Sequence, residues 1–323
     1  MLADRKREHL DICLNKDVRS ALTTGLERYQ LIHDALPEIA LEDVDTETHL
    51  LGHRLGAPLL ISAMTGGMPR AREINRRLAQ AAQELGLAIG VGSQRAGIED
   101  PCLMDTYKVR DVAPDILLFA NLGAVQLNYG YGIRECLLAI ESIQANALVL
   151  HLNPLQEALQ PEGGNTDFRG LISKIAAICE ALPYPVIVKE VGWGISEEVA
   201  RKLASAGVAA LDVAGAGGTS WSEVERHRET ATTGTAVSQA VSARHRAFMG
   251  WGIPTADALI QVRKAVSARH RAVSARHRAH PDLPIIASGG ITNGVEVATC
   301  LALGADAVGM AHALLQAAAD SSE

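Results

Sequence analysis

Short apolar runs recur along the chain from Pro58 onward, and segments with helical spacing separate most of them. Each run holds four or five residues, a length that favours a buried strand over a helix. The predicted strands cover residues 59–62, 88–91, 116–120, 148–152, 186–189, 210–213, 285–288 and 307–310. The clearest predicted helices cover residues 72–85, 171–182, 196–206 and 294–303.

This alternation predicts an α/β fold, and eight regular units favour a closed (β/α)8 TIM barrel. An open doubly wound sheet is the alternative. Three helical segments end in Leu85-Gly86, Ala206-Gly207 and Leu303-Gly304, and glycine is the usual residue in the left-handed position after a helix. We therefore expect a barrel over residues 56–323, preceded by an N-terminal arm and cap over residues 1–55.

A repeated segment interrupts the alternation of strands and helices before the seventh predicted strand. The sequence Val-Ser-Ala-Arg-His-Arg-Ala occurs at residues 241–247, 266–272 and 273–279, and the last two copies are adjacent. Seven residues are close to two helical turns, so a tandem copy inside a helix preserves its buried face. We interpret residues 229–281 as an enlarged loop region with a solvated basic insertion. A metal site or a nucleic-acid patch is the alternative, and the arginines beside each histidine oppose a cation.

Composition limits the class of protein. Hydrophobic residues make up 48% of the 323 residues and aromatic ones only 3%, so the core must be mainly aliphatic. The formal net charge of −7 argues against general nucleic-acid binding. We see no signal peptide and no run near the ~18 apolar residues of a membrane span, so we expect no membrane partner. The five scattered cysteines lack metal-type spacing and suit reduced thiols in the cytoplasm.

The N-terminal segment carries a basic cluster of Arg5, Lys6, Arg7 and His9 before a leucine-rich stretch. One interpretation is a solvated arm. The other is an arm that folds over a site and meets an anion. Such an arm can also reach a neighbouring subunit.

Polar or glycine-rich residues follow every predicted strand. The carboxyl ends of barrel strands meet on one face, so these segments together predict one extended ligand site. Each segment alone is also compatible with an ordinary turn. The residues concerned include Ala63, Met64, Thr65, Ser93, Arg95, Asn121, Thr219, Gly289, Gly290, Ile291, Ala311 and His312.

The most concentrated polar group follows the fourth predicted strand. His151, Asn153, Gln156 and Glu157 arrive together, and Pro154 ends the strand pairing. An imidazole, two amides and a carboxylate at a strand end can bind a metal, hold a substrate or move a proton. A turn that satisfies its own backbone with these side chains is the alternative.

Two further segments favour a phosphorylated ligand. Gly289 and Gly290 follow the seventh strand, where such barrels bind phosphate through backbone N–H groups and a helix N-terminus. Thr219 can add a hydroxyl from the sixth strand. Lys189 ends an apolar strand, so its charge needs a partner. That partner is either Glu190 or another carboxylate, or the electron-rich end of a flavin ring.

Several motifs occur in one order along almost the whole chain. They are Arg5-Lys6 with His9, Ala63-Met64-Thr65-Gly66-Gly67, and the segments at 92–95, 151–157, 188–190, 217–221, 252–255 and 287–291. In this combination the sequence resembles the type 2 isopentenyl-diphosphate delta-isomerases, which are FMN-dependent barrels. It departs from their pattern in the repeat-bearing region between Glu229 and Pro281.

The resemblance implies an isomerase of isoprenoid biosynthesis. It would interconvert isopentenyl diphosphate and dimethylallyl diphosphate by flavin-mediated proton transfer on reduced FMN, with NADPH as reductant and Mg²⁺, as a homo-oligomer. The implied FMN contacts are Ala63, Met64, Thr65, Ser93, Asn121, Lys189, Thr219, Gly289, Gly290, Ile291, Ala311 and His312. The implied substrate contacts are Arg5, Lys6, His9, Ser93, Arg95, His151, Asn153 and Gln156. Gln156 and His151 would be catalytic, and Glu157 would hold Mg²⁺.

Two other kinds of function compete with this interpretation. An FMN-dependent hydroxy-acid oxidoreductase would need a histidine base with arginines, and a nucleotide dehydrogenase on a similar barrel would need a loop cysteine. Cys102 is the nearest candidate for such a cysteine. A flavin-binding barrel without catalytic activity is the non-enzymatic alternative.

Overall fold

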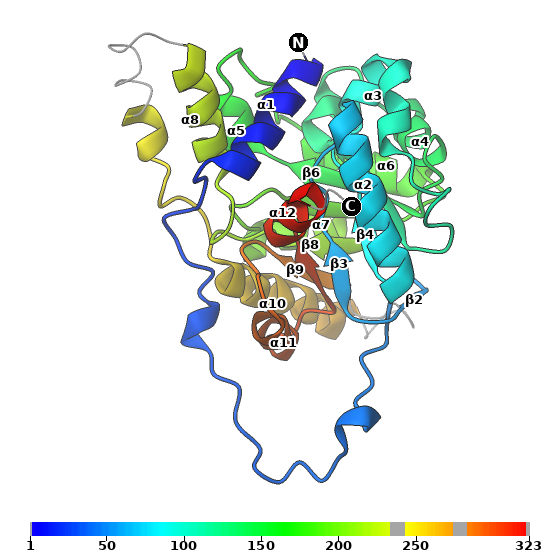
Figure 1. Ribbon diagram of the computed structural model, residues 1–323, viewed down its shortest axis with the longest axis vertical. Helices are drawn as coiled ribbons and strands as arrows, with labels where there is room; N and C mark the ends of the chain where they lie inside the picture. The colour runs from blue at the N-terminus through cyan, green and yellow to red at the C-terminus, as the bar shows by residue number, and fades with distance from the viewer. Residues whose placement is uncertain (1, 233–242, 274–282, 321–323) are drawn as a thin grey trace.

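Eight parallel strands close into a barrel in the order β10-β3-β4-β5-β6-β7-β8-β9, and helices surround it (Figure 1). The structure is a computed structural model that describes residues 2–232, 243–273 and 283–320. The strand β3 pairs with β10 through Leu60↔Gly309 and its neighbours, and this pairing closes the ring. The predicted TIM barrel is therefore confirmed, and the open doubly wound sheet is wrong.

The barrel strands reproduce the predicted apolar runs closely. They are β3 Leu59–Ile61, β4 Ala88–Gly90, β5 Leu118–Gly123, β6 Ala147–Leu152, β7 Val186–Glu190, β8 Ala210–Asp212, β9 Ile285–Ser288 and β10 Ala307–Met310. Every residue of β5 and β7 is buried, because helices cover the outer face of the barrel while side chains fill its interior. The largest difference is β5, which begins later than predicted and continues to Gly123.

Helices follow the strands around the barrel and end where the sequence indicates. They are α2 Pro69–Leu85, α3 Arg95–Glu99, α4 Ile133–Glu141, α5 Pro154–Leu159, α6 Leu171–Ala181, α7 Glu197–Ser205, α8 Trp221–Thr232, α10 Thr255–Val273, α11 Gly294–Ala302 and α12 His312–Asp320. Short 3-10 turns complete the connections, at η1 Leu26–Arg28, η2 Leu41–Asp43, η3 Pro101–Tyr107 and η4 Ala124–Asn128. Gly86, Gly207 and Gly304 have φ of 64°, 86° and 104°, which confirms the predicted left-handed positions.

A hairpin that the sequence pattern did not predict closes one end of the barrel. Its strands β1 (Thr48–Leu50) and β2 (His53–Leu55) pair antiparallel. Leu50 and Leu55 are each 1% exposed. They share a core cluster with residues from the first half of several barrel strands, such as Leu60 and Ala307. The hairpin therefore seals the amino-terminal end of the barrel, opposite the strand ends that carry the polar motifs.

Of the region 229–281 before β9, helix α8 contributes only its last residues, 229–232, and α10 lies wholly inside it. Helix α10 continues to Val273, so the repeat copy at 266–272 extends this helix rather than a loop. Residues 241–242 of the first copy and 274–279 of the third lie outside the described residues. The solvated role assigned to the insertion stays a prediction.

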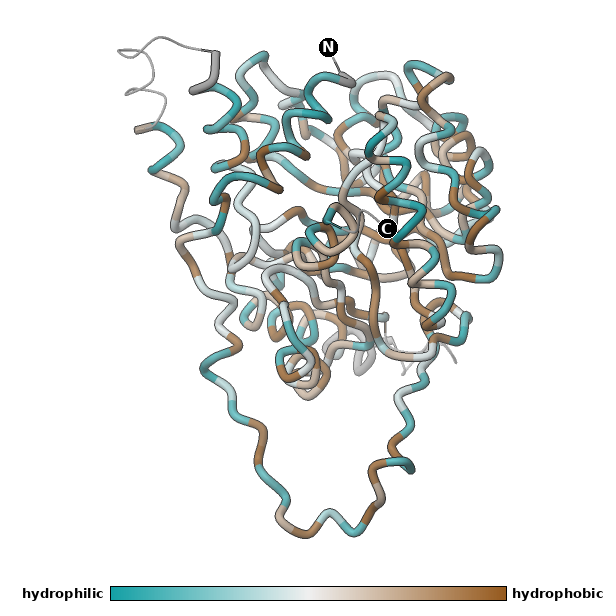
Figure 2. Tube along the Cα trace, in the orientation of Figure 1, coloured by the Kyte–Doolittle hydropathy of each residue, from teal (hydrophilic) through white to brown (hydrophobic). Residues whose placement is uncertain are grey.

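The chain between η1 and the β1–β2 hairpin stands away from the barrel. We call residues 30–47 the extended arm; Figure 1 shows it as a long loop below the body of the molecule. Apart from the short turn η2, the arm has no helix or strand. Apolar segments recur along it, as the brown stretches in Figure 2 show.

Two expectations about the chain's environment can be compared with the structure. Within the described ranges, none of the helices combines the length and apolar character that crossing a bilayer requires. The five cysteines all fall in the described part of the chain, and all are free thiols.

The hairpin yields a stability prediction. Leu55→Ala should lower the free energy of unfolding by about 2–5 kcal/mol, because it leaves a cavity where the barrel end is sealed. Leu85→Ala, at a position that is 63% exposed, should change it by no more than about 0.5 kcal/mol. Urea unfolding followed by circular dichroism measures both, and equal effects would contradict the sealing role.

Candidate active site

One cavity of about 710 Å³ opens at the carboxyl ends of the barrel strands. Its volume lies in the range of roughly 300–1,000 Å³ that is usual for ligand sites. Every residue proposed for the site from the sequence lines this cavity. They are Arg5, Lys6, His9, Ala63, Met64, Thr65, Ser93, Arg95, Asn121, His151, Asn153, Gln156, Glu157, Lys189, Thr219, Gly289, Gly290, Ile291, Ala311 and His312. Their individual roles stay predictions.

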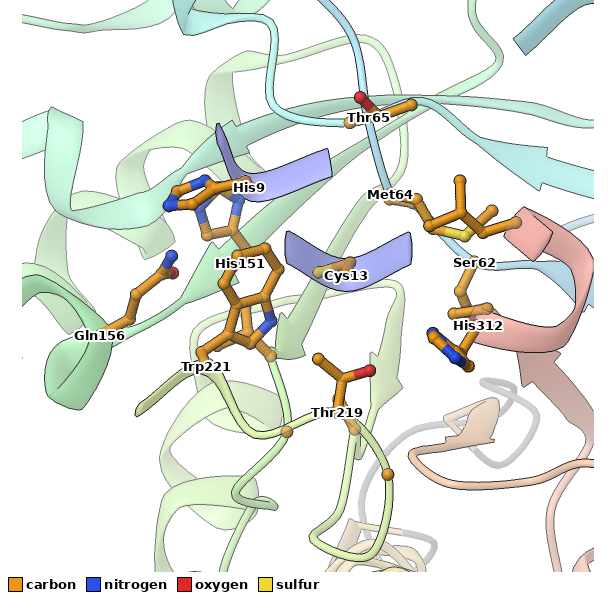
Figure 3. A pocket seen from close by; sticks show the side chains of 18 of the residues that line it. His9, Cys13, Ser62, Met64, Thr65, His151, Gln156, Thr219, Trp221 and His312 are labelled. Carbon is orange, nitrogen blue, oxygen red and sulfur yellow. The ribbon is translucent and has the colours of Figure 1, made fainter. Parts of the chain in front are cut away.

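The cavity has two sides of different chemistry. Figure 3 shows His9, His151, Gln156 and Trp221 gathered on one side, with Ser62, Met64 and His312 on the other. The first side is rich in charge and amides. The second is formed mainly by strand ends and glycine loops.

Helix α1 (Leu2–Asn15) brings the basic cluster to the cavity. Lys6 Nζ donates to Ser93 O at 3.3 Å, and Arg5 Nη1 donates to Gln160 Oε1 at 2.8 Å. Burial, together with the charge of Arg5, lowers the pKa of Lys6 to about 8. The N-terminal helix with the basic cluster therefore folds over the cavity, and the interpretation of this cluster as part of a solvated arm is wrong.

The buried carboxylate of Glu225, which could not be recognised from the sequence, connects α1 to the barrel. Glu225 of α8 is 0% exposed. Its Oε1 accepts from His9 Nε2 at 3.0 Å and from Gln156 Nε2 at 3.2 Å, while Oε2 accepts from Arg228 Nη1 at 2.7 Å. The His9 ring also meets Trp221 edge-on, with 5.2 Å between ring centroids. Glu225 thus fixes side chains from α1 and α5 against each other.

The charge state of this cluster follows from its contacts. Burial alone would raise the pKa of Glu225, but the hydrogen bonds and charges of His9 and Arg228 outweigh it and lower the pKa to about 2. Burial lowers the pKa of His9, and Glu225 opposes that shift. Glu225 is therefore ionised at neutral pH.

Asn153 holds the side chains of Gln156 and Glu157, which lie on α5. Its Nδ2 donates to Gln156 Oε1 at 3.2 Å and to Glu157 Oε1 at 3.0 Å. Glu157 Oε2 accepts from the backbone N of Asn165 at 2.5 Å. Asn153 Oδ1 is buried without a hydrogen-bond partner and so has an unused acceptor for a ligand or water. Gln156 is held from both ends, by Asn153 and by Glu225.

His151 is held by a neighbouring strand end. Its Nδ1 lies 2.8 Å from Asn121 Oδ1, so the ring donates through Nδ1 and leaves Nε2 as an acceptor. Burial, with the charges of Lys189 and Lys6, lowers the pKa of His151 to about 3. The ring is therefore neutral at physiological pH. Asn121, expected to contact FMN, also orients this imidazole.

Lys189 has the carboxylate neighbour that one interpretation required, but it is not Glu190. Its Nζ lies 3.9 Å from Asp212 Oδ2 and donates to the backbone O of Glu190 at 2.5 Å. The Glu190 carboxylate instead accepts from the backbone N–H groups of Val191, Gly192 and Trp193. At 3.9 Å the ion pair with Asp212 is loose, and Lys189 still lines the cavity. Pairing with Asp212 and contact with a ligand are therefore compatible.

Glycine loops form the other side of the cavity. A Cβ on Gly218 would lie 2.5 Å from Gly290 N, and one on Gly289 would collide with the backbone of Gly215. The loops after β8 and β9 therefore pack backbone against backbone. The N-terminus of α12 begins at His312 beside them, and unpaired N–H groups there attract an anion. This cradle fits a phosphate group.

The residues that line the cavity also suit the two expected cofactors, FMN and Mg²⁺. An FMN phosphate would meet Gly289, Gly290 and the start of α12, while Lys189 would face the ring. Mg²⁺ usually takes one or two protein carboxylates together with phosphate oxygens and water. Glu157, with the free acceptor of Asn153 beside it, fits that pattern. The described residues contain no group of three or more His, Cys, Asp or Glu that would hold a metal unaided.

Comparisons with known proteins identify the class of this barrel. A family model described as FMN-dependent dehydrogenase matches residues 157–323. A mandelate oxidase mutant with a monooxide FMN adduct aligns with a TM-score of 0.56 and 17% identity, covering 96% of this chain and 83% of that chain. At this identity the likeness shows the fold alone. Fold and site thus define a barrel of the FMN-dependent dehydrogenase class.

Relatives with about 50% sequence identity assign the chain to one family within that class. The isopentenyl-diphosphate delta-isomerase of Nostoc sp. is 50% identical over 98% of this chain and 85% of its own length. That of Synechococcus sp. is 54% identical over 100% and 86%, and that of Stutzerimonas stutzeri is 51% identical over 100% and 87%. The chain belongs to the isopentenyl-diphosphate delta-isomerase family.

The Glu225 cluster predicts an acid-dependent stability. A carboxyl whose folded pKa is about 2, against about 4.3 when unfolded, stabilises the fold above the unfolded value and loses this as pH falls toward 2. Glu225→Gln should therefore lower stability at pH 7 and weaken its decline between pH 5 and pH 3. Urea midpoints at each pH measure this.

The matched control is Glu223→Gln, on the same helix, whose carboxylate pairs with Arg226. This variant should retain the acid dependence of the wild type. A Glu225→Gln protein that declines as steeply as the wild type between pH 5 and pH 3 would contradict the assigned charge state.

Proposed function

We propose that the protein interconverts isopentenyl diphosphate and dimethylallyl diphosphate on FMN, as an enzyme of isoprenoid biosynthesis. The observation that carries the proposal is the convergence of all twenty motif residues on one cavity in a chain that is about half identical to named isomerases. Reduced FMN, when bound, would supply the proton-transfer chemistry. The chain's own residues bind the substrate, orient it and exclude water.

The diphosphate side would be the charged side of the cavity. Arg5, Lys6 and Arg95 supply cations there, and only part of their hydrogen-bonding capacity is used within the protein. Charged donors at such sites bind phosphate oxygens strongly. Because α1 carries two of these cations, binding the diphosphate would hold α1 over the cavity.

Gln156 and His151 would act beside the hydrocarbon part of the substrate. The Gln156 amide is held by Glu225 and Asn153, so it presents a fixed edge to the cavity. Neutral His151 presents Nε2, which suits a protonated diphosphate oxygen or a metal-bound water. Fixed dipoles of this kind stabilise developing charge without reorganising.

The finer cofactor assignments are also proposals. Glu157 would hold Mg²⁺ together with the diphosphate, since Mg²⁺ prefers carboxylate and phosphate oxygens. NADPH as the reductant of FMN and a cytoplasmic location are proposed on the family resemblance of the sequence alone.

The competing enzyme functions are less well supported. Cys102 is exposed and does not line the cavity, so it is not placed as the nucleophile of a nucleotide dehydrogenase. Cys13 does line the cavity, but burial raises the pKa of its thiol to about 12, which disfavours the reactive thiolate. A hydroxy-acid oxidoreductase is supported only by the shared barrel.

We also propose that the chain forms a homo-oligomer through the extended arm. Six large apolar side chains of the arm are about half exposed or more; they are Leu31, Ile32, Leu36, Ile39, Leu41 and Val44. Exposed apolar side chains gathered on one segment often mark a protein–protein interface.

The negative charge of the extended arm favours the body of a second copy of this chain as the surface that it contacts. The arm holds six of the 37 acidic residues and no Lys or Arg, which leaves 31 acidic against 30 basic residues elsewhere. Two arms would repel each other, whereas an arm meets a nearly neutral body on a second copy.

The function is tested with protein reconstituted with FMN, NADPH, Mg²⁺ and isopentenyl diphosphate. We expect dimethylallyl diphosphate to form, and Glu157→Gln to lower turnover at limiting Mg²⁺ by about tenfold or more while FMN stays bound. Product analysis and flavin absorbance measure these outcomes. Protein that refuses FMN, or yellow protein that oxidises a hydroxy acid but does not isomerise, would reject the proposal.

The arm is tested by mass photometry. The wild type should be oligomeric, and the triple variant Ile32→Ser, Leu36→Ser and Leu41→Ser should be monomeric with an unchanged circular dichroism spectrum. The control changes Leu85 and Val295, which are exposed elsewhere, to Ser and should leave the mass unaltered. A monomeric wild type, or an arm variant of wild-type mass, would refute the role of the arm.

A further inference from the structure

The segment that follows α1 lies on the loop after β8. We call residues 16–25 the strap. Val18 O accepts from Ser220 N at 2.7 Å, and Ser20 N donates to Gly218 O at 2.8 Å. Between these bonds, Arg19 and Thr219 form an antiparallel bridge. The strap is thus a short paired strand on the loop that carries Thr219.

Thr24, near the C-terminal end of the strap, packs between the glycine loops that follow β8 and β9. A Cβ on Gly290 would lie 2.6 Å from Thr24 Cγ2, and one on Gly217 would collide with the Thr24 backbone. Thr24 O also accepts from Ala256 N, at the start of α10, at 2.9 Å. Thr24 is 9% exposed. The strap, the β8 loop and the β9 loop are therefore packed in contact, without spare volume.

The strap is also continuous with the helix that carries Arg5, Lys6 and His9. Helix α1 ends at Asn15, and Val18, three residues later, is 3% exposed and lines the cavity. One covalent segment therefore meets the residues proposed for the diphosphate and the loops proposed for the flavin. Anything that orders either end limits the freedom of the other.

We propose that the strap is a clamp that closes the phosphate end of the flavin site and couples the binding of FMN to the binding of a diphosphate. This proposal rests on the function proposed above, because it takes those two ligands. Each ligand would order the same segment, so the second one bound meets a segment that is already fixed. Linkage makes the effect reciprocal. Thr24 does not line the cavity and acts as a positioning residue.

The coupling is measured by titrating the apoprotein with FMN, followed by flavin fluorescence, with and without inorganic pyrophosphate and Mg²⁺. We expect pyrophosphate to tighten FMN binding by about 5-fold or more, the lower end of typical coupling between sites. Thr24→Ala removes the methyl group that faces Gly290 together with the hydroxyl that accepts from Leu26 N at 3.3 Å, so it should weaken FMN binding about tenfold and abolish most of the pyrophosphate effect.

Two matched variants separate clamping from general destabilisation. Thr24→Val also loses the hydroxyl but keeps a methyl group against Gly290, so it should restore both FMN affinity and coupling. Thr23→Ala removes a neighbouring exposed hydroxyl that bonds to Glu27 and should behave as the wild type. A Thr24→Ala protein with wild-type FMN affinity and pyrophosphate effect would overturn the clamp.

Hydrogen exchange in the wild type provides a measurement that depends on no variant. The amides of Ser20 and Ser220, which donate the two strap bonds, should exchange more slowly with FMN bound and more slowly again with pyrophosphate. FMN binding that leaves both amides unchanged would overturn the clamp alone. FMN binding and strap protection without isomerisation would contradict the proposed function alone, and a protein that refuses FMN would contradict both.

Discussion

Closure of the barrel between β3 and β10 is the constraint on which the site depends. It places the loop at Ala63–Thr65 beside the segment that begins at Ala311, almost 250 residues later in the chain. In an open sheet these two strands would lie at separate edges, and no common cavity would join their ends. The eight-strand ring brings both to one face, where α1 then covers the opening. The chemistry of the cavity is therefore a property of the closed sheet rather than of any one motif.

Charged groups in the cavity wall and directly behind it are held mainly by partners from other elements. Glu225 of α8 has His9, Gln156 and Arg228 around it, and Lys189 of β7 has Asp212 of β8. A buried charge without such partners would be strongly destabilising, so each group is fixed where it is satisfied. The result is a cavity wall whose dipoles are set before a ligand arrives.

The strands, the glycine helix ends and the strand-end residues that line the cavity follow from local patterns, which is why the sequence predicts them well. Apolar runs report burial, and residues at strand ends must share a face once the ring closes. The β1–β2 hairpin was missed because its three-residue strands give almost no periodic signal. Glu225 was missed because an acidic residue within a polar helix looks like a solvated one. Only the packing of α1 on α8 shows that it is buried. Likewise, the sequence could not decide between Glu190 and another carboxylate as the partner of Lys189 without knowing which way each side chain turns; the structure shows Asp212.

The backbone contacts among the glycine loops bear on how this protein can change over evolution. Any side chain at Gly218, Gly289 or Gly290 would displace a second loop as well as its own. Single substitutions there are therefore poor starting points for altered ligand preference. The opposite wall, built from longer side chains on α1, α5 and α8, can be altered one position at a time. New specificities in this lineage should arise there, while the glycine-loop half of the cavity remains nearly invariant.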